Sequence, residues 1–442
     1  MAVSIAIAVR YVGTYLPVGV FDVAVTIRVV LYARLGRREG GRSRFVKSLV
    51  QGFTDLNSSD VEYILVVDPE TGDWIRNLVS DTVSVAVRPW ESRTVWARHT
   101  MVEPIKERIR PVATLVEPVL SPLAGAVSPG SDMNDNTAPS VPELDQFFES
   151  LDPDVIHWLA RYWERSSVPM VYSLGDVQDR RYPEHFTIST KEWRETFCKS
   201  GCREADAAIT ASEFVASNIA TEYGVPRSQI HTIHRGAPTE YDETSLSVEQ
   251  VCDRFDIEPG FVFYPGKKWE HKNHSRLIEA LGQVKQEYGT DVPLVCTGAQ
   301  SPPDQFEGLK ATTRRLGLEE SVHWLGYVGP DVLLALYEAA GFLVFPTLYE
   351  GQGFPLLEAM TCGTATACSD IPPLREYGGD APHYFDPKSV DEITEALWKL
   401  YSNNSYRMRI ASDGRRRATD FSWETTARAY ESVYKSVARA DE

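Results

Sequence analysis

The stretch Glu350-Gly-Gln-Gly-Phe-Pro-Leu-Leu-Glu358 carries a carboxylate at each end, and we expect it to link a strand to a helix that includes Glu358. Before it, the run Gly341-Phe-Leu-Val-Phe-Pro-Thr-Leu-Tyr349 is short and apolar, which is typical of a buried strand followed by a turn. Pro355 suits the first turn of a helix, so we expect a helix to begin near this residue. Strand, glycine-rich loop and helix in this order predict one unit of a parallel α/β sheet.

The glycine-rich loop between the two carboxylates can bind an anion. Glycine has no side chain, so the backbone N–H groups of this loop are accessible to an anion. The start of a helix adds the positive end of the helix dipole. Glu350 and Glu358 would add acceptors for hydroxyl groups. A ligand with both phosphates and hydroxyls fits this combination, and a sugar nucleotide has both.

A second candidate loop lies upstream, within Phe263-Tyr-Pro-Gly-Lys-Lys-Trp-Glu-His-Lys-Asn273. It follows an expected strand and carries Lys267, Lys268 and Lys272. Two ammonium groups at such a position can bind a diphosphate and stabilise the charge that grows on it as a sugar bond breaks. The alternative interpretation is a solvated basic loop.

Length, composition and charge describe an acidic globular protein. The chain has 442 residues, enough for two or three domains, with 43% hydrophobic and 24% charged residues. The net charge of -17 argues against nonspecific nucleic-acid binding, which needs an excess of Lys and Arg. An anionic donor would therefore be bound by a local basic cluster. The six cysteines are scattered, and we expect them to be reduced, as is usual in the cytosol.

Short β-branched runs alternate with amphipathic helical stretches along the chain, which is the pattern of parallel βαβ units. The expected strands are 28–33, 62–67, 83–87, 155–158, 170–174, 207–211, 229–234, 261–265, 293–297, 322–325, 342–345 and 364–368. Expected helices are 44–53, 275–288, 330–340, 390–401 and 423–434. This order predicts an α/β protein with two Rossmann-like domains whose parallel sheets face each other across a cleft.

Turn residues and a charged stretch at Pro238–Gly260 separate the two expected domains. We place an N-terminal domain at residues 1–245 and a C-terminal domain, which carries both candidate loops, at residues 258–420. The first includes an extra apolar segment at 1–26, whose charges leave no run long enough for a membrane helix and which lacks a signal cleavage site. It also includes a loop rich in Pro, Ser, Gly and Asn at 118–142.

The stretch Phe345–Thr364 resembles the donor-site signature of the retaining glycosyltransferases of family 4 (glycosyl transferases group 1), which have the GT-B fold. The likeness continues through Ser369–Asp380 and Phe385–Pro387. The upstream loop Phe263–Asn273 is similar to the family's glycine turn with its basic pair. The resemblance covers roughly Arg28 to Tyr434, with gaps in the first half.

The resemblance implies an enzyme that moves a sugar from a UDP- or GDP-linked donor to an acceptor hydroxyl with retention of configuration, in glycan or polysaccharide biosynthesis. No protein nucleophile is implied, because the acceptor attacks on the face that the diphosphate leaves and a phosphate oxygen takes its proton. The implied partners are the donor and a glycan or lipid-linked acceptor, without a cofactor, and the implied location is cytoplasmic. The resemblance makes residues 1–245 the acceptor-side domain and residues 258–420 the nucleotide-sugar-binding domain. Residues 421–442 would form a terminal helix that crosses back to the first domain.

Site residues carry over where the sequence matches the family pattern. The implied catalytic residues are Lys267, Lys272 and Glu350. The implied donor-binding residues are Gly41, Gly266, Val328, Gly351, Gln352, Gly353, Phe354 and Glu358. Glu350 would contact the sugar hydroxyls or face the anomeric centre, whereas Glu358 would bind the ribose hydroxyls. Val328 lies in a turn similar to the one whose backbone reads the nucleotide base.

One position departs from the family pattern. Family members often have His-Asp after the strand that corresponds to residues 170–174, whereas this chain has Gly175-Asp176. A role for a histidine at that point is therefore in doubt. His157, at the end of another expected strand, could partly substitute, and we name His157 and Asp176 as acceptor-side candidates. A satisfied core histidine is the alternative interpretation of His157.

Two further charged segments have competing interpretations. Asp152-Pro-Asp154 has the spacing of a metal-binding carboxylate pair, but it contains proline and precedes a strand. We therefore predict a turn with capping at this point and no metal site. The run Arg93–Arg110 has basic residues interleaved with apolar ones, which is typical of a solvated helix face or of a helix in peripheral contact with anionic lipid at the inner membrane face.

Other functions could use the same residues. A glycosidase would place two carboxylates around the scissile bond, but the glycine loop and the lysines suit a phosphate ligand better. An epimerase would convert the donor with no acceptor present, and a phosphorylase of the glycogen type would need a lysine for pyridoxal phosphate that nothing here marks. A non-catalytic sugar-nucleotide-binding protein would more often have lost a glutamate or a lysine.

Overall fold

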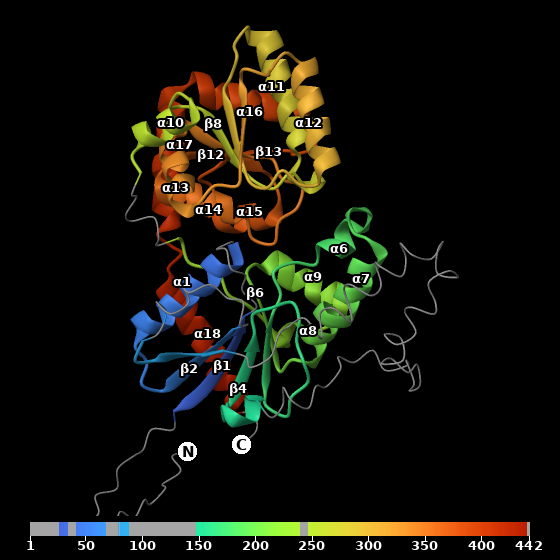
Figure 1. Cartoon of the computed structure of the whole chain (residues 1–442), viewed down its shortest axis with the longest axis vertical. Helices are drawn as coiled ribbons and strands as arrows, with labels where there is room; N and C mark the ends of the chain where they lie inside the picture. Colours follow the sequence, from blue (N-terminus) through green and yellow to red (C-terminus); the bar gives the residue numbers. More distant parts are fainter. Residues whose placement is uncertain are drawn as a thin grey trace, which may run out of the picture. The chain divides into compact units, whose positions relative to one another are not determined.

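The computed structural model describes residues 26–33, 41–67, 78, 80–87, 147–238 and 246–439. Three segments for which the sequence makes predictions lie outside these residues: 1–25, 93–110 and 118–142. The chain divides into two compact units (Figure 1). The first comprises residues 1–174, 187–209 and 427–442, and the second comprises 175–186 and 210–426. The predicted domain boundaries at residues 245 and 258 stay predictions.

Among the described residues, the first half of the chain forms a seven-stranded sheet with the order β3-β2-β1-β4-β5-β6-β7. Its strands are β1 (Ile27–Ala33), β2 (Val61–Val67), β3 (Val83–Val87), β4 (Val155–Trp158), β5 (Met170–Ser173), β6 (Ala207–Thr210) and β7 (Ile230–Thr232). The described helices of this half are α1 (Gly41–Leu56), α6 (Gln178–Arg181), α7 (Ile188–Arg194), α8 (Ser200–Glu204) and α9 (Glu213–Tyr223). The central strand β1 pairs in parallel with both β2 and β4.

The second unit holds a six-stranded sheet with the order β10-β9-β8-β11-β12-β13. Its strands are β8 (Val262–Pro265), β9 (Leu294–Thr297), β10 (Val322–Gly326), β11 (Phe342–Phe345), β12 (Ala365–Ser369) and β13 (His383–Phe385). The helices are α10 (Val248–Phe255), α11 (His274–Tyr288), α12 (Pro303–Arg315), α13 (Pro330–Ala339), α14 (Phe354–Cys362), α15 (Pro372–Gly378), α16 (Val390–Ser402) and α17 (Asn404–Ala418). All its described strand pairs are parallel. In Figure 1, α11 and α12 lie on one side of this sheet, and α13 and α14 lie on the other.

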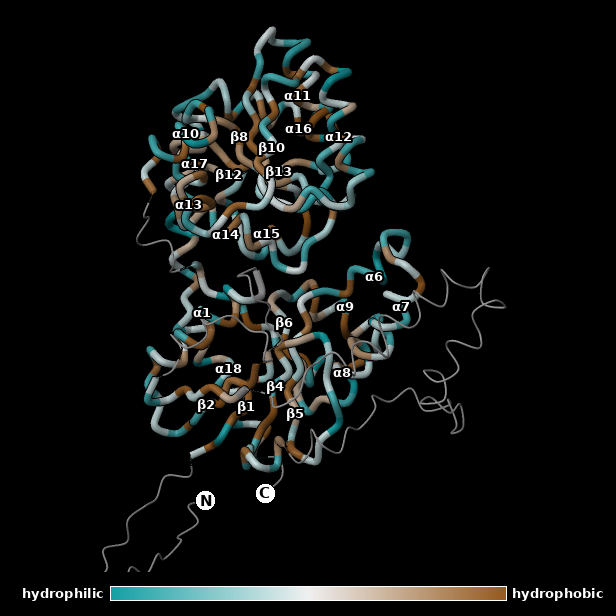
Figure 2. The backbone as a smooth tube through the Cα atoms, in the orientation of Figure 1, coloured by the Kyte–Doolittle hydropathy of each residue, from teal (hydrophilic) through white to brown (hydrophobic). Residues whose placement is uncertain are grey.

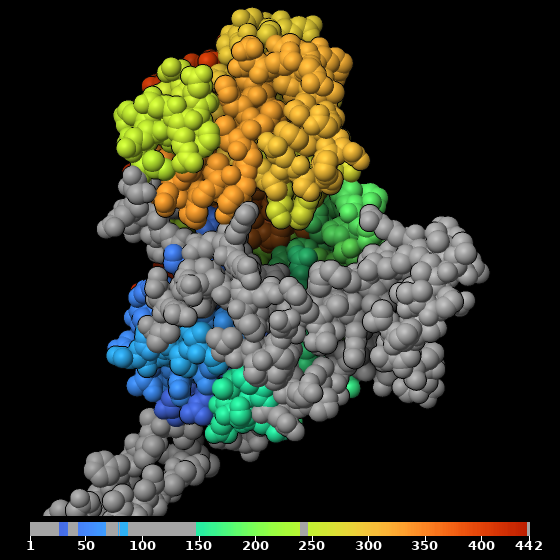
Figure 3. Space-filling model, viewed as in Figure 1, coloured from blue at the N-terminus to red at the C-terminus, as the bar shows by residue number. Residues whose placement is uncertain are grey.

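Helices on both faces explain why the central strands of this sheet are fully buried. Every residue of β8, β9 and β11 is buried, as expected for a parallel sheet covered on both sides. Figure 2 shows the hydrophobic segments gathered at the strands and the hydrophilic segments in the outer helices. On the face drawn in Figure 3, much of the surface of the second unit belongs to residues coloured yellow-green to orange. The two sheets confirm the predicted pair of parallel α/β domains.

The terminal helix α18 (Trp423–Ala438) joins the two units in sequence, because residues from Ala427 onward belong to the first. Within that unit, Glu431 accepts a hydrogen bond from Ser58 at 2.9 Å, and Lys435 forms an ion pair with Asp60 at 3.0 Å. Among the described residues, no helix combines the length and the apolar content that crossing a bilayer requires.

The order of the second sheet predicts where a ligand would bind. The chain runs outward from β8 to β9 and β10 on one side of the sheet, and outward from β11 to β12 and β13 on the other. Because β8 and β11 are neighbours, the loops that follow them lead in opposite directions. In open parallel sheets, ligands bind where such a divergence leaves a crevice at the carboxyl ends of the strands. The loops that follow β8 and β11 are the lysine-bearing loop and the glycine-rich loop identified from the sequence.

Candidate active site

Hydrogen bonds connect the lysine-bearing loop and the glycine-rich loop at the carboxyl ends of β8 and β11. The carbonyl of His271 accepts a bond from the Leu348 N–H at 2.7 Å and a longer one from Thr347 Oγ1. Asn273 Nδ2 donates to the carbonyl of Pro346 at 2.8 Å and to that of Pro387 at 2.7 Å. Neither His271 nor Asn273 was predicted as a site residue, because the sequence does not indicate that their contacts cross between loops.

Two of the predicted catalytic residues meet in an ion pair. The ammonium of Lys272 donates to Oε1 of Glu350, and the two residues are 78 positions apart in the chain. Their side chains are only 17% and 13% exposed. Lys272 Nζ also lies 5.7 Å from the ring centroid of Phe345, at the end of β11. The site therefore places a fixed positive charge directly beside a carboxylate.

The two adjacent lysines of the first loop point to different surroundings. Lys267 is exposed, and its ammonium lies 4.6 Å from the ring centroid of Trp269. Lys268 is buried, with its ammonium bonded to the carbonyls of Gly266 and Thr297 at 2.9 and 2.8 Å. Burial lowers the pKa of the Lys268 ammonium. Lys267 is thus the member of this pair whose charge can reach a ligand in solvent.

Glycine is required at two positions of the second loop. Gly353 caps α14 with a φ of +90°, and a Cβ there would lie 2.1 Å from Leu374 Cδ2. A Cβ on Gly351 would lie 2.0 Å from the carbonyl oxygen of Gly175. Ser212 Oγ donates to the carbonyl of Gly351 at 2.6 Å, which fixes the loop from another side. The predicted donor-binding residue Phe354 is the first residue of α14.

Gln352 is buried between these glycines, and neither its amide nitrogen nor its amide oxygen has a hydrogen-bond partner among the described residues. Buried polar side chains are nearly always hydrogen-bonded, so a bound ligand or water would supply the missing partners. This position distinguishes Gln352 from an ordinary surface glutamine.

Glu358 and Val328 lie at the same edge of the sheet. Glu358, on the first turns of α14, is 2% exposed and accepts a hydrogen bond from Tyr337 at 2.7 Å. Val328 is half-buried and follows β10, so it also lies at a carboxyl end. Gly41 begins α1, the helix that follows β1, where the order of the first sheet diverges between β1 and β4.

The two acceptor-side candidates are in different surroundings. Asp176 belongs to residues 175–186 of the second unit, and its carboxylate accepts a bond from the Gln178 N–H at 3.2 Å. The same segment bonds to the glycine-rich loop, since Tyr182 donates to the carbonyl of Leu348 at 3.2 Å. Asp176 is therefore held near the second loop.

His157 lies in the core of the first unit. Its side chain is fully buried, with Nδ1 2.7 Å from the Tyr434 hydroxyl and Nε2 2.8 Å from Ser173 Oγ. Burial lowers the pKa of this imidazole to about 3. This is the geometry of a satisfied core histidine.

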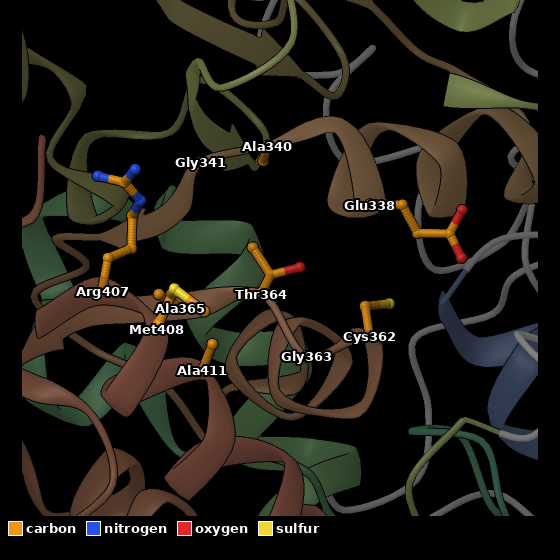
Figure 4. A pocket seen from close by; sticks show the side chains of 10 residues that line it. All are labelled: Glu338, Ala340, Gly341, Cys362, Gly363, Thr364, Ala365, Arg407, Met408 and Ala411. Carbon is orange, nitrogen blue, oxygen red and sulfur yellow. The ribbon is translucent and has the colours of Figure 1, made fainter. Parts of the chain in front are cut away.

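A cavity of about 160 Å³ opens at the other end of the second sheet (Figure 4). It is lined by residues that precede β11 and β12, including Gly341 and Thr364, and by Arg407 and Met408 of α17. Because β11 and β12 are parallel, this cavity lies at the amino ends of the strands, whereas the candidate site lies at their carboxyl ends. Within the described part of the chain, no group of three or more His, Cys, Asp or Glu side chains could hold a metal ion.

Comparisons with known families agree with this architecture. The model described as "Glycosyl transferases group 1" matches residues 254–417, and the model "Glycosyltransferase Family 4" matches residues 90–241. The chain is similar in structure to Anabaena Alr3699/HepE in complex with UDP and glucose, with a TM-score of 0.65 at 17% identity. That match covers 93% of this chain and 100% of the other.

The chain is also similar in sequence to bacterial mannosyltransferases. It is 28% identical to O-antigen chain mannosyltransferase B of Escherichia coli over 60% of this chain and 70% of that protein. It is 27% identical to the MMP alpha-(1->4)-mannosyltransferase of Mycolicibacterium hassiacum over 63% and 61% of the two chains. A match to the serotype-specific mannosyltransferase WbdA of E. coli spans 36% of that longer protein.

Proposed function

The chain belongs to the glycosyltransferases of group 1 and family 4, and we propose that it transfers a sugar from a nucleoside-diphosphate sugar to an acceptor hydroxyl, with retention of configuration. The observation that carries this proposal is the Lys272–Glu350 pair between the loops that follow β8 and β11. A cation suited to phosphates and a carboxylate suited to hydroxyls meet where an α/β sheet binds ligands.

Each predicted residue has a distinct role in this proposal. Lys267 and Lys272 bind the diphosphate and stabilise the negative charge that grows on it as the bond to the sugar breaks. Glu350 binds hydroxyls of the transferred sugar, and Glu358 accepts hydrogen bonds from the ribose. The amino terminus of α14 adds backbone N–H groups for an anionic oxygen.

The chemical step is a single substitution at the anomeric carbon. The bond from this carbon to the acceptor oxygen forms on the face from which the diphosphate departs, while the bond to the diphosphate oxygen breaks. The acceptor proton passes to an oxygen of the leaving diphosphate. The protein contributes orientation and charge stabilisation, so neither a protein nucleophile nor a metal ion is needed.

The named relatives suggest the biological setting. Because they include an O-antigen chain mannosyltransferase, we propose a role in polysaccharide biosynthesis, with mannose as the first sugar to test and a glycan or lipid-linked acceptor. A cytoplasmic location with peripheral membrane contact through Arg93–Arg110 remains part of the proposal.

A ligand screen followed by an assay tests the function. UDP-, GDP-, ADP- and TDP-sugars are screened by thermal shift, because a ligand that binds the folded state alone raises the melting temperature. The donor that stabilises the protein is then incubated with and without methyl α-mannoside as acceptor, and the product's anomeric configuration is read by NMR. Transfer with retention supports the proposal. Conversion of the donor without an acceptor would indicate an epimerase, and stabilisation without turnover in any acceptor screen would indicate a binding protein.

A further inference from the structure

Lys268 is buried at the base of the lysine-bearing loop, in contrast to its neighbour Lys267. Its side chain is 1% exposed, and its ammonium donates to the carbonyls of Gly266 and Thr297. Gly266 follows β8 and Thr297 ends β9, so one side chain bonds to the carboxyl ends of two adjacent strands. The ammonium also lies 5.2 Å from the ring centroid of Trp324 in β10, the next strand of the sheet.

The backbone beneath this side chain is tightly packed. Gly298 has a φ of +98°, and a Cβ there would lie 2.5 Å from the carbonyl oxygen of Gly266. The Gly266 N–H donates to the carbonyl of Thr297 at 3.1 Å, and the Lys268 N–H donates to that of Ala299 at 3.4 Å. The turns that follow β8 and β9 are thus in direct contact, and the Lys268 ammonium hydrogen-bonds to both of them on their buried side.

The charge of Lys268 has no acidic partner among the described residues, whose ion pairs do not include it. Moving an ammonium group out of water is normally destabilising unless the group is paired. Two carbonyl dipoles and an aromatic face offset part of this cost. A buried cation that keeps its charge under a loop also raises the positive potential above that loop.

The bond to the Gly266 carbonyl sets the direction of the next amide. Because a trans peptide is planar, its C=O and N–H point in opposite directions. The Gly266 carbonyl points to the buried ammonium, so the Lys267 N–H points away from it. Lys268 therefore fixes the orientation of the peptide from which the exposed Lys267 side chain extends.

We propose that Lys268 is a positioning residue for the donor diphosphate. It holds the Gly266 turn so that the Lys267 N–H and ammonium face this anion, and it adds its own positive charge to their attraction. The inference rests on the proposed function and assigns to the buried Lys268 an indirect effect on diphosphate binding, through the loop above it. A lysine that merely stabilises the fold would affect every ligand equally, which separates the two roles.

The test compares nucleotides that differ by one phosphate. Lys268→Met keeps the length of the side chain without the charge or the hydrogen bonds. Lys285→Met is the matched control, since Lys285 also donates to a carbonyl, that of Gly317 at 2.8 Å, but lies at the opposite end of α11. Dissociation constants are measured by calorimetry for UDP, GDP and ADP and for their monophosphates.

We expect Lys268→Met to weaken binding of the preferred diphosphate at least tenfold and binding of its monophosphate no more than threefold, while Lys285→Met leaves both unchanged. Equal losses for both nucleotides, or no loss, would overturn the inference. Lys268→Gln, which retains one donor group, should be intermediate. Failure of both Lys268 variants to fold would also overturn it, in favour of a purely structural role.

A ligand-free measurement separates this inference from the proposed function. Amide hydrogen exchange at Gly266 and Gly298, whose N–H groups donate to the carbonyls of Thr297 and Gly326, should accelerate at least tenfold in Lys268→Met relative to the wild type. If the wild type binds none of the nucleotides, the proposed function has failed, and the diphosphate role fails with it. Unchanged exchange, together with normal nucleotide binding by the wild type, would instead refute the positioning by Lys268 alone.

Discussion

Lys272 and Glu350 form an ion pair between the loops that follow two neighbouring parallel strands, β8 and β11. Each charge is largely shielded from water, so each depends on the other when no ligand is bound. In the proposed complex, the donor's diphosphate would pair with the Lys272 ammonium, and the donor's sugar hydroxyls would donate hydrogen bonds to the Glu350 carboxylate. Binding and charge compensation are therefore coupled at this contact.

Replacing Lys272 by Ala should lower the transfer rate by at least about 100-fold, because a charge that stabilises the leaving diphosphate is lost. Glu350→Ala should lower it by a similar factor. Initial rates at saturating donor, measured after thermal unfolding has shown that each variant is folded, check the expectation.

Lys285→Ala is a suitable control for charge removal, since Lys285 forms an ion pair with Asp291 in which both side chains are well exposed. Its activity should stay within about twofold of the wild type, because exposed ion pairs contribute little. Full activity of both Lys272→Ala and Glu350→Ala would refute the site assignment.

Gly351→Ala should disrupt the glycine-rich loop. The added methyl group would lie 2.0 Å from the carbonyl oxygen of Gly175, so the backbone must shift, at a cost of about 1–3 kcal/mol in unfolding free energy. Donor affinity should fall at least tenfold by calorimetry. Gly308→Ala, in α12 where nothing lies within 4 Å, should instead leave binding intact and stabilise by up to about 1 kcal/mol. Normal affinity in Gly351→Ala would contradict the tight packing.

Tyr337→Phe removes the hydroxyl that donates to Glu358 at 2.7 Å. The carboxylate of Glu358 is then less well oriented, so the KM for the donor should rise about three- to tenfold with little change in kcat. Glu358→Gln should have a larger effect in the same direction, because a charged acceptor for the ribose is lost. Steady-state kinetics provide the measurement, and a change confined to kcat would argue against a ribose contact.

The buried His157 should make stability depend on pH. Its pKa is lowered to about 3 in the folded protein, whereas an unfolded histidine titrates near 6.5. Between these values the unfolded chain binds a proton that the folded one does not, so the unfolding free energy falls as the pH falls below about 6.5. This histidine contributes a slope of up to about 1.4 kcal/mol per pH unit.

Urea unfolding at pH 7, 6 and 5 measures this slope. His157→Gln should lower stability at pH 7, since two hydrogen bonds are perturbed, yet flatten the decline toward pH 5 relative to the wild type. Comparison between the two proteins removes the contributions of other buried groups such as His271 and His274. Parallel pH profiles would show that His157 is not the titrating group.

Most of the fold follows from hydrophobic pattern. Strand β11 was predicted with its observed limits because a short, wholly apolar run between turn residues has few other interpretations. Strand β13 was missed, since His383–Phe385 has three residues and two of them are only half-buried. Its place at the sheet edge depends on pairing with β12, which the sequence does not reveal.

The candidate site was predictable as two loops but not in its internal contacts. The positions of Lys272 and Glu350 follow from strand order, because both loops lie at carboxyl ends. The different surroundings of Lys267 and Lys268 were not predictable, since adjacent residues in a loop have no fixed periodicity to distinguish inward from outward. The interpretation of His157 was also left open, because its partner Tyr434 is 277 residues away.

The interleaved composition of the two units limits how this enzyme can be divided. The chain passes from one unit to the other after Leu174, Phe186, Ile209 and Thr426, so no single cut yields two complete units. A fragment that begins at residue 246 would lack the two segments of the second unit that carry Tyr182 and Ser212. These residues donate hydrogen bonds to the carbonyls of Leu348 and Gly351, at the glycine-rich loop. Engineering that exchanges donor specificity between relatives must therefore transplant several short pieces together rather than one contiguous half.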